Sequence, residues 1–332
     1  MKKVVLRILA CIVVTSVCVG CGMKQDNANS SDASGSNAGQ TTTDSKPEYT
    51  LRLGHCLAAD HPYELGAQEF ARLVADYTDG MVQIESYPAS QLGDERALWE
   101  GVTMGTIDIA LSSTATLCNF DDRFLVLELP FLFPDYESAQ KVLYSDFGQE
   151  KLKGLEDINV VGLDYWWAGW NNLGSCEGDF ITPDDVKGKN IRCMESTMWV
   201  SYIKSLGANP TPMAMSETYT ALQNKTLDGY SYPLVTVKTS AMYEVSESYS
   251  KGMNACYASV PIAMNKTLFD SMPVEYQEAI KKAALEAGEY MRNLVLEEIE
   301  NCEKILTEEY GYRVINDIDQ SVWREAVQAC YD

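Results

Sequence analysis

The sequence predicts an α/β protein with two lobes and a long helix toward its C-terminal end. From Tyr49 onward, short apolar strands alternate with amphipathic helices, an order typical of parallel sheets with crossover helices. The alternation occurs in two separate blocks, which indicates two lobes. A segment from Pro273 to Gly311 carries apolar residues at three- and four-residue spacing, as an amphipathic helix does.

The apolar pattern divides each block into elements. The first is expected to contain strand 49–57, helix 64–78, a turn at Asp79-Gly80, strand 81–88, helix 94–105 and strand 108–113. The second is expected to contain strands 158–167 and 190–195 and helices 197–207 and 216–227, the last ending at Asp228-Gly229. Ligands of open α/β sheets bind beyond the carboxyl ends of the strands, so two facing lobes predict a cleft there.

The apolar stripe of the long final helix favours packing against the core over a partner helix or a cofactor box. Acidic residues at Asp94 and Glu95 are expected to begin a helix, where they suit the positive end of the helix dipole. Arg96, next to them, is expected at the surface.

The charge of the chain excludes several partners. Of the 332 residues, 26 are Lys or Arg and 48 are Asp or Glu, which gives a formal net charge of -22. Such a surface repels phosphate backbones and anionic headgroups, so no nucleic acid is expected as a partner. With 2 His in the chain, His-based zinc sites and Ser/His hydrolase triads are disfavoured, and no cofactor or metal motif is present.

The first residues predict export from the cytoplasm. Three basic residues precede an apolar run that ends at Gly20, directly before Cys21, as in a secretory signal. The end of the run resembles the lipobox of bacterial lipoproteins, so residues 1–21 are expected to be a lipoprotein signal peptide with Cys21 lipid-modified. An uncleaved membrane anchor is the rival interpretation. Residues 22–48 are polar and small, and they predict a disordered tether, or simply a disordered tail, before a domain at 49–332.

The remaining cysteines do not form a recognisable metal or disulfide pattern. They are scattered singly without a C-x-x-C, and their odd number leaves at least one free thiol. Most are expected to be small buried hydrophobic residues. They are Cys56, Cys118, Cys176, Cys193, Cys256, Cys302 and Cys330.

Several segments together resemble the DctP-type solute-binding proteins of TRAP transporters. They are YPASQLGDERALWEGVTMGTIDIAL, LPFLF, DDVKGKNIRCMES, GANPTPMAMSETYTALQNKTLDG and the final long helix, in family order from Tyr49 to the C-terminus. The resemblance implies a periplasmic-binding-protein-like fold, with two α/β lobes joined by hinge strands and spanned by the long helix. Lobe 1 is expected at about 49–165 plus part of the C-terminal region, and lobe 2 at about 166–260.

Arg192, in NIRCMES, falls on the family's strand arginine, which forms a two-toothed salt bridge with the ligand carboxylate. The physics agrees, because a planar guanidinium offers two parallel N–H donors to the two oxygens of a carboxylate. A strand also fixes its geometry before binding, which lowers the ordering cost. The alternative is a structural arginine paired with an acid of the neighbouring lobe.

Three positions depart from the family's pattern. Asn171 stands where a second arginine is common, Tyr232 replaces an Asn that touches the ligand, and Ser113 replaces the glutamate of sialic-acid binders. These changes disfavour sialic acid and other many-hydroxyl acids. The three side chains supply neutral hydrogen bonds instead.

Aromatic residues gather around the same segments. Trp166, Trp167, Trp170, Tyr230 and Tyr232 favour a monocarboxylate with a flat or hydrophobic tail, such as an aromatic or branched 2-oxo acid. Trp166 and Trp167 are neighbours on a strand, so at most one faces the cleft.

Three further residues complete the predicted ligand site: Met213, Phe131 and His55. Met213 ends GANPTPM, Phe131 lies in LPFLF, and His55 follows the first strand. For His55 a capping or core role is the stronger interpretation, as it is for His61.

The leading hypothesis is an extracytoplasmic, lipid-anchored receptor, a monomer without cofactor, that captures a small organic acid. It would deliver the acid to the integral membrane subunits of a TRAP transporter, and its two lobes would close on the ligand. A sugar acid is the alternative ligand. The alternative functions are an extracytoplasmic enzyme that acts on a small acid and a sensor domain of a signalling receptor.

Overall fold

The structure is a computed structural model that describes residues 46–331. The predicted signal peptide, the lipid-modified Cys21 and most of the predicted tether lie outside the described residues. Between residues 46 and 331, no helix combines the length and the apolar character needed to cross a membrane.

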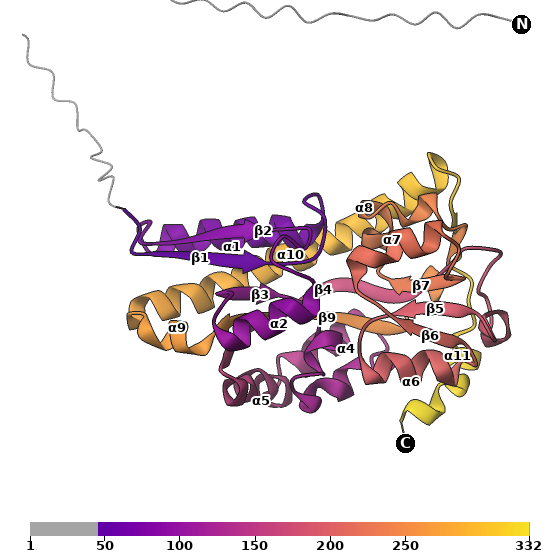
Figure 1. Ribbon diagram of the computed structural model, residues 1–332, viewed down its shortest axis with the longest axis horizontal. Coiled ribbons are helices and arrows are strands. Elements are labelled where there is room, and N and C mark those ends of the chain that lie inside the picture. The colour runs from indigo at the N-terminus through magenta and orange to yellow at the C-terminus, as the bar shows by residue number, and fades with distance from the viewer. Residues whose placement is uncertain (1–45, 332) are drawn as a thin grey trace, which may run out of the picture. The chain divides into compact units, whose positions relative to one another are not determined.

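The first part of the fold is a small parallel sheet with crossover helices, as the sequence predicts (Figure 1). β1 (Tyr49–Gly54) pairs in parallel with β2 (Val82–Tyr87) and β3 (Ile109–Leu111). α1 (Pro62–Tyr77) and α2 (Glu95–Met104) connect these strands. α2 ends at Gly105, whose φ of 77° lies in the left-handed region that glycine adopts without strain.

Two long antiparallel strands join the first part to the second. β4 (Val160–Ser175) pairs with β9 (Cys256–Asn265) over most of its length, and β9 also pairs with β3. From Asn172 onward β4 pairs with β7 instead. The expected strand at 158–167 therefore continues to Ser175, and one strand belongs to both parts of the sheet. Figure 1 shows β4 and β9 running between the two groups of elements.

The second part repeats the parallel arrangement. β5 (Asn190–Cys193) lies between β6 (Asn209–Pro212) and β7 (Gly229–Tyr232) and is parallel to both. The helices are α6 (Thr197–Ser205), α7 (Met215–Gln223) and α8 (Leu234–Thr239).

One predicted boundary was wrong in this part. α7 ends at Gln223, before a left-handed Lys225, and not at Asp228-Gly229. Gly229 is a strand residue. A Cβ at this position would lie 2.6 Å from the carbonyl oxygen of Gly174 on β4, so glycine permits the close pairing of the two strands.

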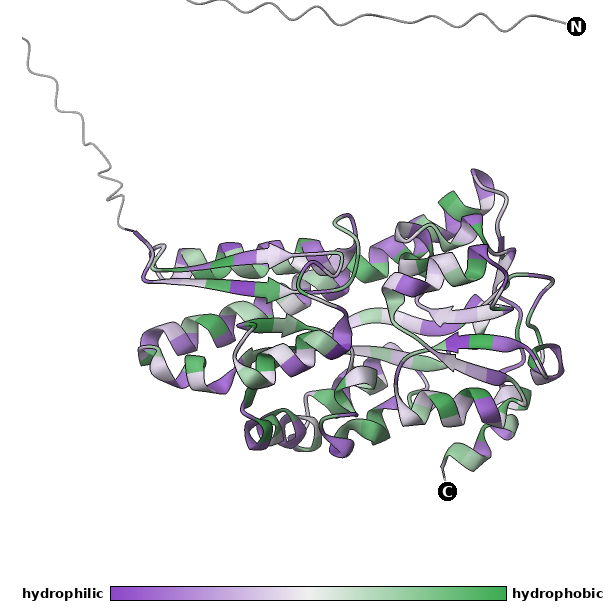
Figure 2. Cartoon of the chain, viewed as in Figure 1, coloured by the Kyte–Doolittle hydropathy of each residue, from purple (hydrophilic) through white to green (hydrophobic). Residues whose placement is uncertain are grey.

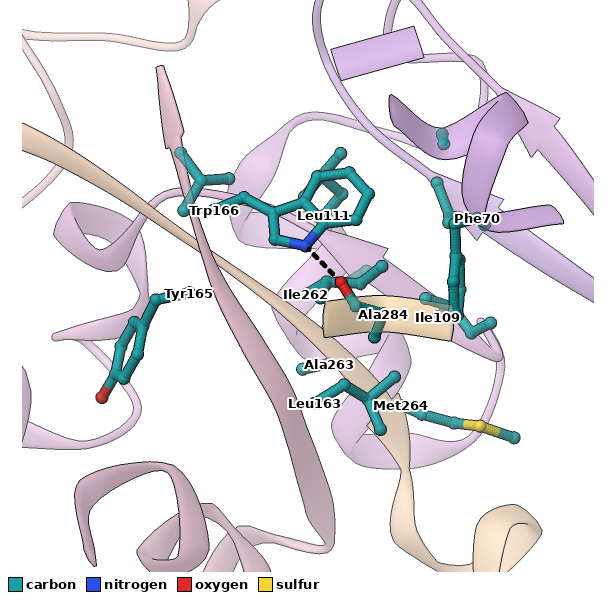
Figure 3. Packing of buried hydrophobic residues seen from close by; sticks show 14 of the residues in the cluster. Phe70, Ile109, Leu111, Leu163, Tyr165, Trp166, Ile262, Ala263, Met264 and Ala284 are labelled. Atoms are coloured by element: carbon teal, nitrogen blue, oxygen red, sulfur yellow. Dashed lines mark hydrogen bonds between the residues drawn. The ribbon is translucent and has the colours of Figure 1, made fainter. Parts of the chain in front are cut away.

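The long helix α10 (Val274–Glu308) packs along the sheet through its buried stripe. The Trp166 indole donates to the Ala284 carbonyl at 3.1 Å and fixes β4 against the helix, as Figure 3 shows. Arg292 of the same helix is paired with the buried Asp164 of β4 at 3.2 Å. The core-packing role predicted for this helix is therefore confirmed.

Shorter elements fill the spaces between these layers. They are α3 (Thr114–Leu117), a 3-10 helix at Asp122–Glu128, α4 (Tyr136–Leu143), α5 (Asp146–Gly154), 3-10 helices at Leu155–Ile158, Pro183–Val186, Met242–Glu244, Lys251–Met253 and Gln328–Cys330, β8 (Ser248–Tyr249), α9 (Lys266–Ser271), β10 (Arg313–Val314) and α11 (Gln320–Ala326).

The buried apolar residues form separate cores. The largest lies around β1, β3, α1, α2 and the middle of α10, and two smaller ones cover the opposite faces of the second part of the sheet. The helices show apolar and polar residues alternating along their length (Figure 2). Separate cores joined by two strands are the arrangement expected for two lobes. The residue limits 49–165 and 166–260 stay a prediction, because β4 and β9 belong to both parts.

Candidate ligand-binding site

A cavity of about 50 Å³ lies where the two parts of the sheet meet. The residues that follow the carboxyl ends of β1, β3, β5 and β7 contribute to its wall, as the α/β arrangement predicts. An enclosed space of this kind favours a small ligand. The lining residues are Cys56, Leu57, Tyr63, Glu95, Ser113, Ala115, Glu128, Ala168, Asn171, Arg192, Met194, Met215, Tyr232, Pro233, Thr236, Ala258, Ser259 and Val260.

Arg192 supplies a buried cation to this cavity. Its residue is 3% exposed, and among residues 46–331 it forms no salt bridge. The Nε and Nη2 atoms donate to the Met213 carbonyl at 3.2 and 3.0 Å, and Nη1 donates to the Ser231 carbonyl at 3.2 Å. These backbone contacts use three of the five guanidinium N–H groups, which leaves one on each terminal nitrogen.

Tyr232 fixes the plane of that guanidinium. The central carbon of Arg192 lies 4.2 Å from the centre of the Tyr232 ring, a cation–π contact. The ring is held in turn by its hydroxyl, which lies 2.8 Å from the Thr218 hydroxyl of α7. Burial raises the pKa of Tyr232 to about 12, so the phenol stays neutral beside the cation.

A bulge in β4 brings two residues of one strand to the cavity wall. Ala168 and Asn171 both line the cavity although they are three positions apart, a spacing that places residues on opposite faces of a regular strand. The pairing with β9 shifts register between Trp167 and Trp170, and Gly169 has a φ of 110°. The extra residue of this bulge lies between Trp167 and Trp170, and it changes the direction of the side chains that follow, so that Asn171 faces the cavity.

Two carboxyl groups face the same cavity in different environments. Glu95, at the start of α2, accepts hydrogen bonds from the Ser113 amide, the Ser113 hydroxyl and the Thr116 hydroxyl at 3.0, 2.7 and 2.9 Å. These three hydrogen bonds hold the Glu95 carboxyl in one orientation. Glu128 is 3% exposed and accepts one bond, from the Trp199 indole at 2.8 Å. Burial raises the pKa of Glu128 to about 8, and the negative Glu95 adds to the effect.

Neutral polar groups complete the wall. The Ser259 hydroxyl is buried and has no hydrogen-bond partner among the described residues. The Thr236 hydroxyl lies 3.3 Å from Nε2 of His61, whose pKa is lowered by burial and by nearby His55. Burial raises the pKa of the Cys56 thiol well above its ordinary value. The cavity therefore presents one cation, one anion and several neutral oxygens within an otherwise apolar wall.

Four of the ten predicted ligand residues line the cavity: Arg192, Asn171, Tyr232 and Ser113. A fifth, Met213, contributes through its carbonyl, which accepts from Arg192.

The structure places the other five away from the cavity wall. Trp167 stacks on the ring of Tyr257 at 5.6 Å, and Trp170 meets the same ring edge-on. The Tyr230 hydroxyl contacts Tyr312, the ring of Phe131 packs under Arg324, and His55 lies 2.9 Å from Glu64. Rings that pack against one another in this way serve the core. Of the five aromatic residues expected near the ligand, Tyr232 alone lines the cavity, beside Tyr63, which was not predicted from the sequence.

Sequence reasoning missed several lining residues, above all Glu95, Glu128 and Ser259. The sequence marks Glu95 only as a helix start, which it is, but its side chain turns toward Ser113. Glu128 directly precedes LPFLF, and that position was the one available signal. Nothing in the sequence marks Ser259, because it lies in the middle of an apolar strand.

Known proteins are similar to this chain over most of its length. Residues 53–332 match the family described as bacterial extracellular solute-binding protein, family 7. The chain belongs to this family. It is 32% identical over 288 residues to the 2,3-diketo-L-gulonate-binding periplasmic protein YiaO of Escherichia coli (strain K12), covering 86% of this chain and 87% of that one.

Solved structures of TRAP periplasmic solute-binding proteins share the fold of this family 7 chain. One from Polaromonas sp. JS666, bound to D-erythronate, has a TM-score of 0.83 at 29% identity and covers 85% of this chain and 93% of its own. Another from Bordetella bronchiseptica, with density assigned to pantoate, has a TM-score of 0.81 at the same identity and coverage. The protein is therefore a TRAP-type solute-binding receptor with the two-lobe fold, and the alternative of an enzyme is set aside.

Proposed function

We propose that this receptor binds a short monocarboxylate with an oxo or hydroxy group and a compact, branched tail, and that Arg192 binds its carboxylate. The observation that carries the proposal is the buried guanidinium, which lines the cavity with no protein carboxylate as its partner among residues 46–331. A buried charge without a counter-ion is costly, so a site of this kind favours an anionic ligand.

The free N–H groups of Arg192 suit a carboxylate. One donor on each terminal nitrogen matches the two parallel bonds of a fork-to-fork pair. Each hydrogen bond to a charged group contributes about 1.5–3 kcal/mol. Since the Met213 and Ser231 carbonyls and the Tyr232 ring already fix the guanidinium, little conformational entropy is lost on binding.

Glu95 favours a ligand with a single carboxylate. Two carboxylates about 6 Å apart repel by about 3 kcal/mol at an effective dielectric constant of 20. A dicarboxylate that reached from Arg192 toward Glu95 would meet this repulsion inside a cavity of about 50 Å³.

The apolar part of the wall supports a branched tail over an aromatic one. Leu57, Met194, Met215 and Val260 are aliphatic, and the tryptophans on which the aromatic alternative rested pack elsewhere. Pantoate, to which the density in the Bordetella structure is assigned, is a branched hydroxy acid.

A small sugar acid is the second candidate. The hydroxyls of Ser259, Thr236 and Ser113 and the amide of Asn171 offer partners to its hydroxyl groups. The relatives that bind 2,3-diketo-L-gulonate and D-erythronate support this alternative.

Delivery to TRAP membrane subunits would follow closure of the two lobes on the ligand. Two contacts already join the lobes near the cavity: the Ser216 hydroxyl donates to Asp94 at 2.9 Å, and the Asn119 amide donates to the Glu195 carbonyl at 2.6 Å. Ligand contacts from both lobes add to these and shift the equilibrium toward the closed state. A lipid anchor at Cys21 and a monomeric state remain part of this proposal and rest on the sequence alone.

A thermal-shift screen with mono- and dicarboxylates tests the proposal. A ligand that binds the folded state raises the apparent melting temperature by mass action. Short branched oxo or hydroxy acids are expected to give the largest shifts, and Arg192→Ala is expected to abolish them. Arg96→Ala is the matched control, because Arg96 is an exposed arginine of α2 beside Glu95. Shifts that survive in Arg192→Ala would refute the role of Arg192.

A further inference from the structure

Glu128 differs from Glu95, the other carboxyl group of the cavity, because it accepts one hydrogen bond where Glu95 accepts three. It lies at the end of the 3-10 helix Asp122–Glu128 and is buried, yet no Lys, Arg or His among residues 46–331 forms a salt bridge with it. Its Oε2 atom accepts the Trp199 indole N–H, and its Oε1 atom makes no hydrogen bond with another described residue. Oε1 is not fully enclosed by protein atoms. The residue lines the cavity, so the open side of its carboxyl faces that space.

We propose that Glu128 is a specificity-determining residue whose neutral carboxyl donates a hydrogen bond to a ligand oxygen other than the carboxylate bound by Arg192. This inference rests on the proposed function and deepens it. It assigns the site to acids with an oxo or hydroxy oxygen and explains how they are distinguished from the same acids without that oxygen.

The surroundings keep this carboxyl neutral. A buried carboxylate loses its hydration, and here one indole N–H is its sole donor among the described residues. Of the charged groups around the cavity, Glu95 of α2 repels a second negative charge, and Arg192 of β5 already contacts the Met213 and Ser231 carbonyls. The other titratable groups that face Glu128 are Tyr63 of α1, Cys118 after α3 and Cys256 of β9, and burial raises the pKa of all three.

A neutral carboxyl differs from a carboxylate in what it recognises. Its O–H donates and its carbonyl oxygen accepts, so Trp199 takes the acceptor and the O–H remains for the ligand. A site built to hydrogen-bond a ligand oxygen rejects the analogue that lacks it, because the buried donor is then left without a partner.

The proposal predicts a pH dependence of binding. Because Glu128 donates only when protonated, and burial raises its pKa to about 8, binding should be about tenfold weaker at pH 9 than at pH 7. The acids to be tested are fully ionised over this range, so their own titration does not contribute.

The experiment uses the folded receptor and two pairs of acids whose members differ by one oxygen: 3-methyl-2-oxobutanoate with 3-methylbutanoate, and D-erythronate with its 2-deoxy analogue, 3,4-dihydroxybutanoate of the same configuration at C3. Calorimetry at pH 6, 7, 8 and 9 gives each affinity. Wild-type protein should prefer the oxygenated member by at least tenfold and lose affinity above pH 8. Glu128→Gln keeps an acceptor for Trp199 and an N–H donor for the ligand, so it should keep the preference and lose the pH dependence.

Two further variants make the result decisive. Glu128→Leu removes the donor and should bind both members of a pair about equally. Asp122→Asn changes an exposed carboxyl of the same 3-10 helix and should behave as wild type. Glu128→Gln with the wild-type pH profile, or wild-type protein without preference, would overturn the role of Glu128 while Arg192-dependent binding stands. If neither pair binds at all, the proposed function fails and this inference fails with it.

Discussion

Glu128→Gln is also expected to change the stability of the protein without any ligand. In the unfolded chain a glutamate ionises near pH 4.5, whereas burial raises the folded-state pKa of Glu128 to about 8. Between these values the unfolded state has released the proton and the folded state retains it. Folding stability therefore falls as the pH rises from about 4.5 to about 8, and it is constant with respect to this group above that range.

The size of the effect follows from the same interval. At 1.36 kcal/mol per pH unit, the separation of the two pKa values corresponds to about 5 kcal/mol in the free energy of unfolding. Glutamine has no proton to release, so the free energy of unfolding of the variant does not fall over this pH range on account of residue 128. Its stability relative to wild type should rise by about 5 kcal/mol between pH 4.5 and pH 8.

Urea unfolding at half-unit steps from pH 4.5 to pH 9 measures this difference. All other titrating groups are shared by the two proteins, so the difference between wild type and variant isolates Glu128. Asp122→Asn, on the same 3-10 helix but exposed, should track wild type at every pH. If the difference between wild type and Glu128→Gln changes by less than about 1 kcal/mol over the whole range, Glu128 titrates as it does in water and the reasoning about its burial is wrong.

Three further predictions follow from other contacts. Glu95→Gln should strengthen succinate binding about a hundredfold by removing a repulsion of about 3 kcal/mol, and calorimetry that shows no gain would contradict the monocarboxylate preference. Gly288→Ala should lower the melting temperature, because a Cβ there would lie 2.3 Å from the Asp164 carboxylate, and the overpacking costs about 1–3 kcal/mol; an unchanged melting temperature would show that α10 can shift. Asp164→Asn should cost about 3–5 kcal/mol in urea unfolding because it leaves Arg292 buried without its carboxylate; a loss below 1 kcal/mol would indicate that water reaches the guanidinium.

The repeated strand–helix order was predictable because it depends on local periodicity. The residues that predict β1, α1 and α2 lie within each element, and the glycine that ends α2 directly follows it. The extent of β4 was not predictable in the same way. The bulge after Trp167 interrupts the two-residue period, so the pattern ends there although the strand continues to Ser175.

Residues of the site were predictable only where the residue type is rarely found in a purely structural role at that kind of position. An arginine on a central strand of an acidic chain is unusual, and Arg192 lines the cavity. Tryptophan has many uses, and Trp166 and Trp167 pack against α10 and Tyr257. The hydrogen-bond partner of Glu128 is Trp199, which lies 71 positions away in the sequence, so no local pattern reveals the environment of this carboxyl.

The net charge of -22 does not prevent this receptor from attracting anions, because distance and burial decide which charges a ligand meets. Surface charges beyond about 8 Å are largely screened at physiological ionic strength, whereas charges inside a closed cavity are not. We propose that, of the three Arg and Glu side chains that line the cavity, Arg192 attracts one carboxylate, Glu95 repels a second, and Glu128 donates a hydrogen bond from its neutral carboxyl. Opening the lobes to water should therefore weaken the Arg192 contact and the hydrogen bond from Glu128 together and release the acid.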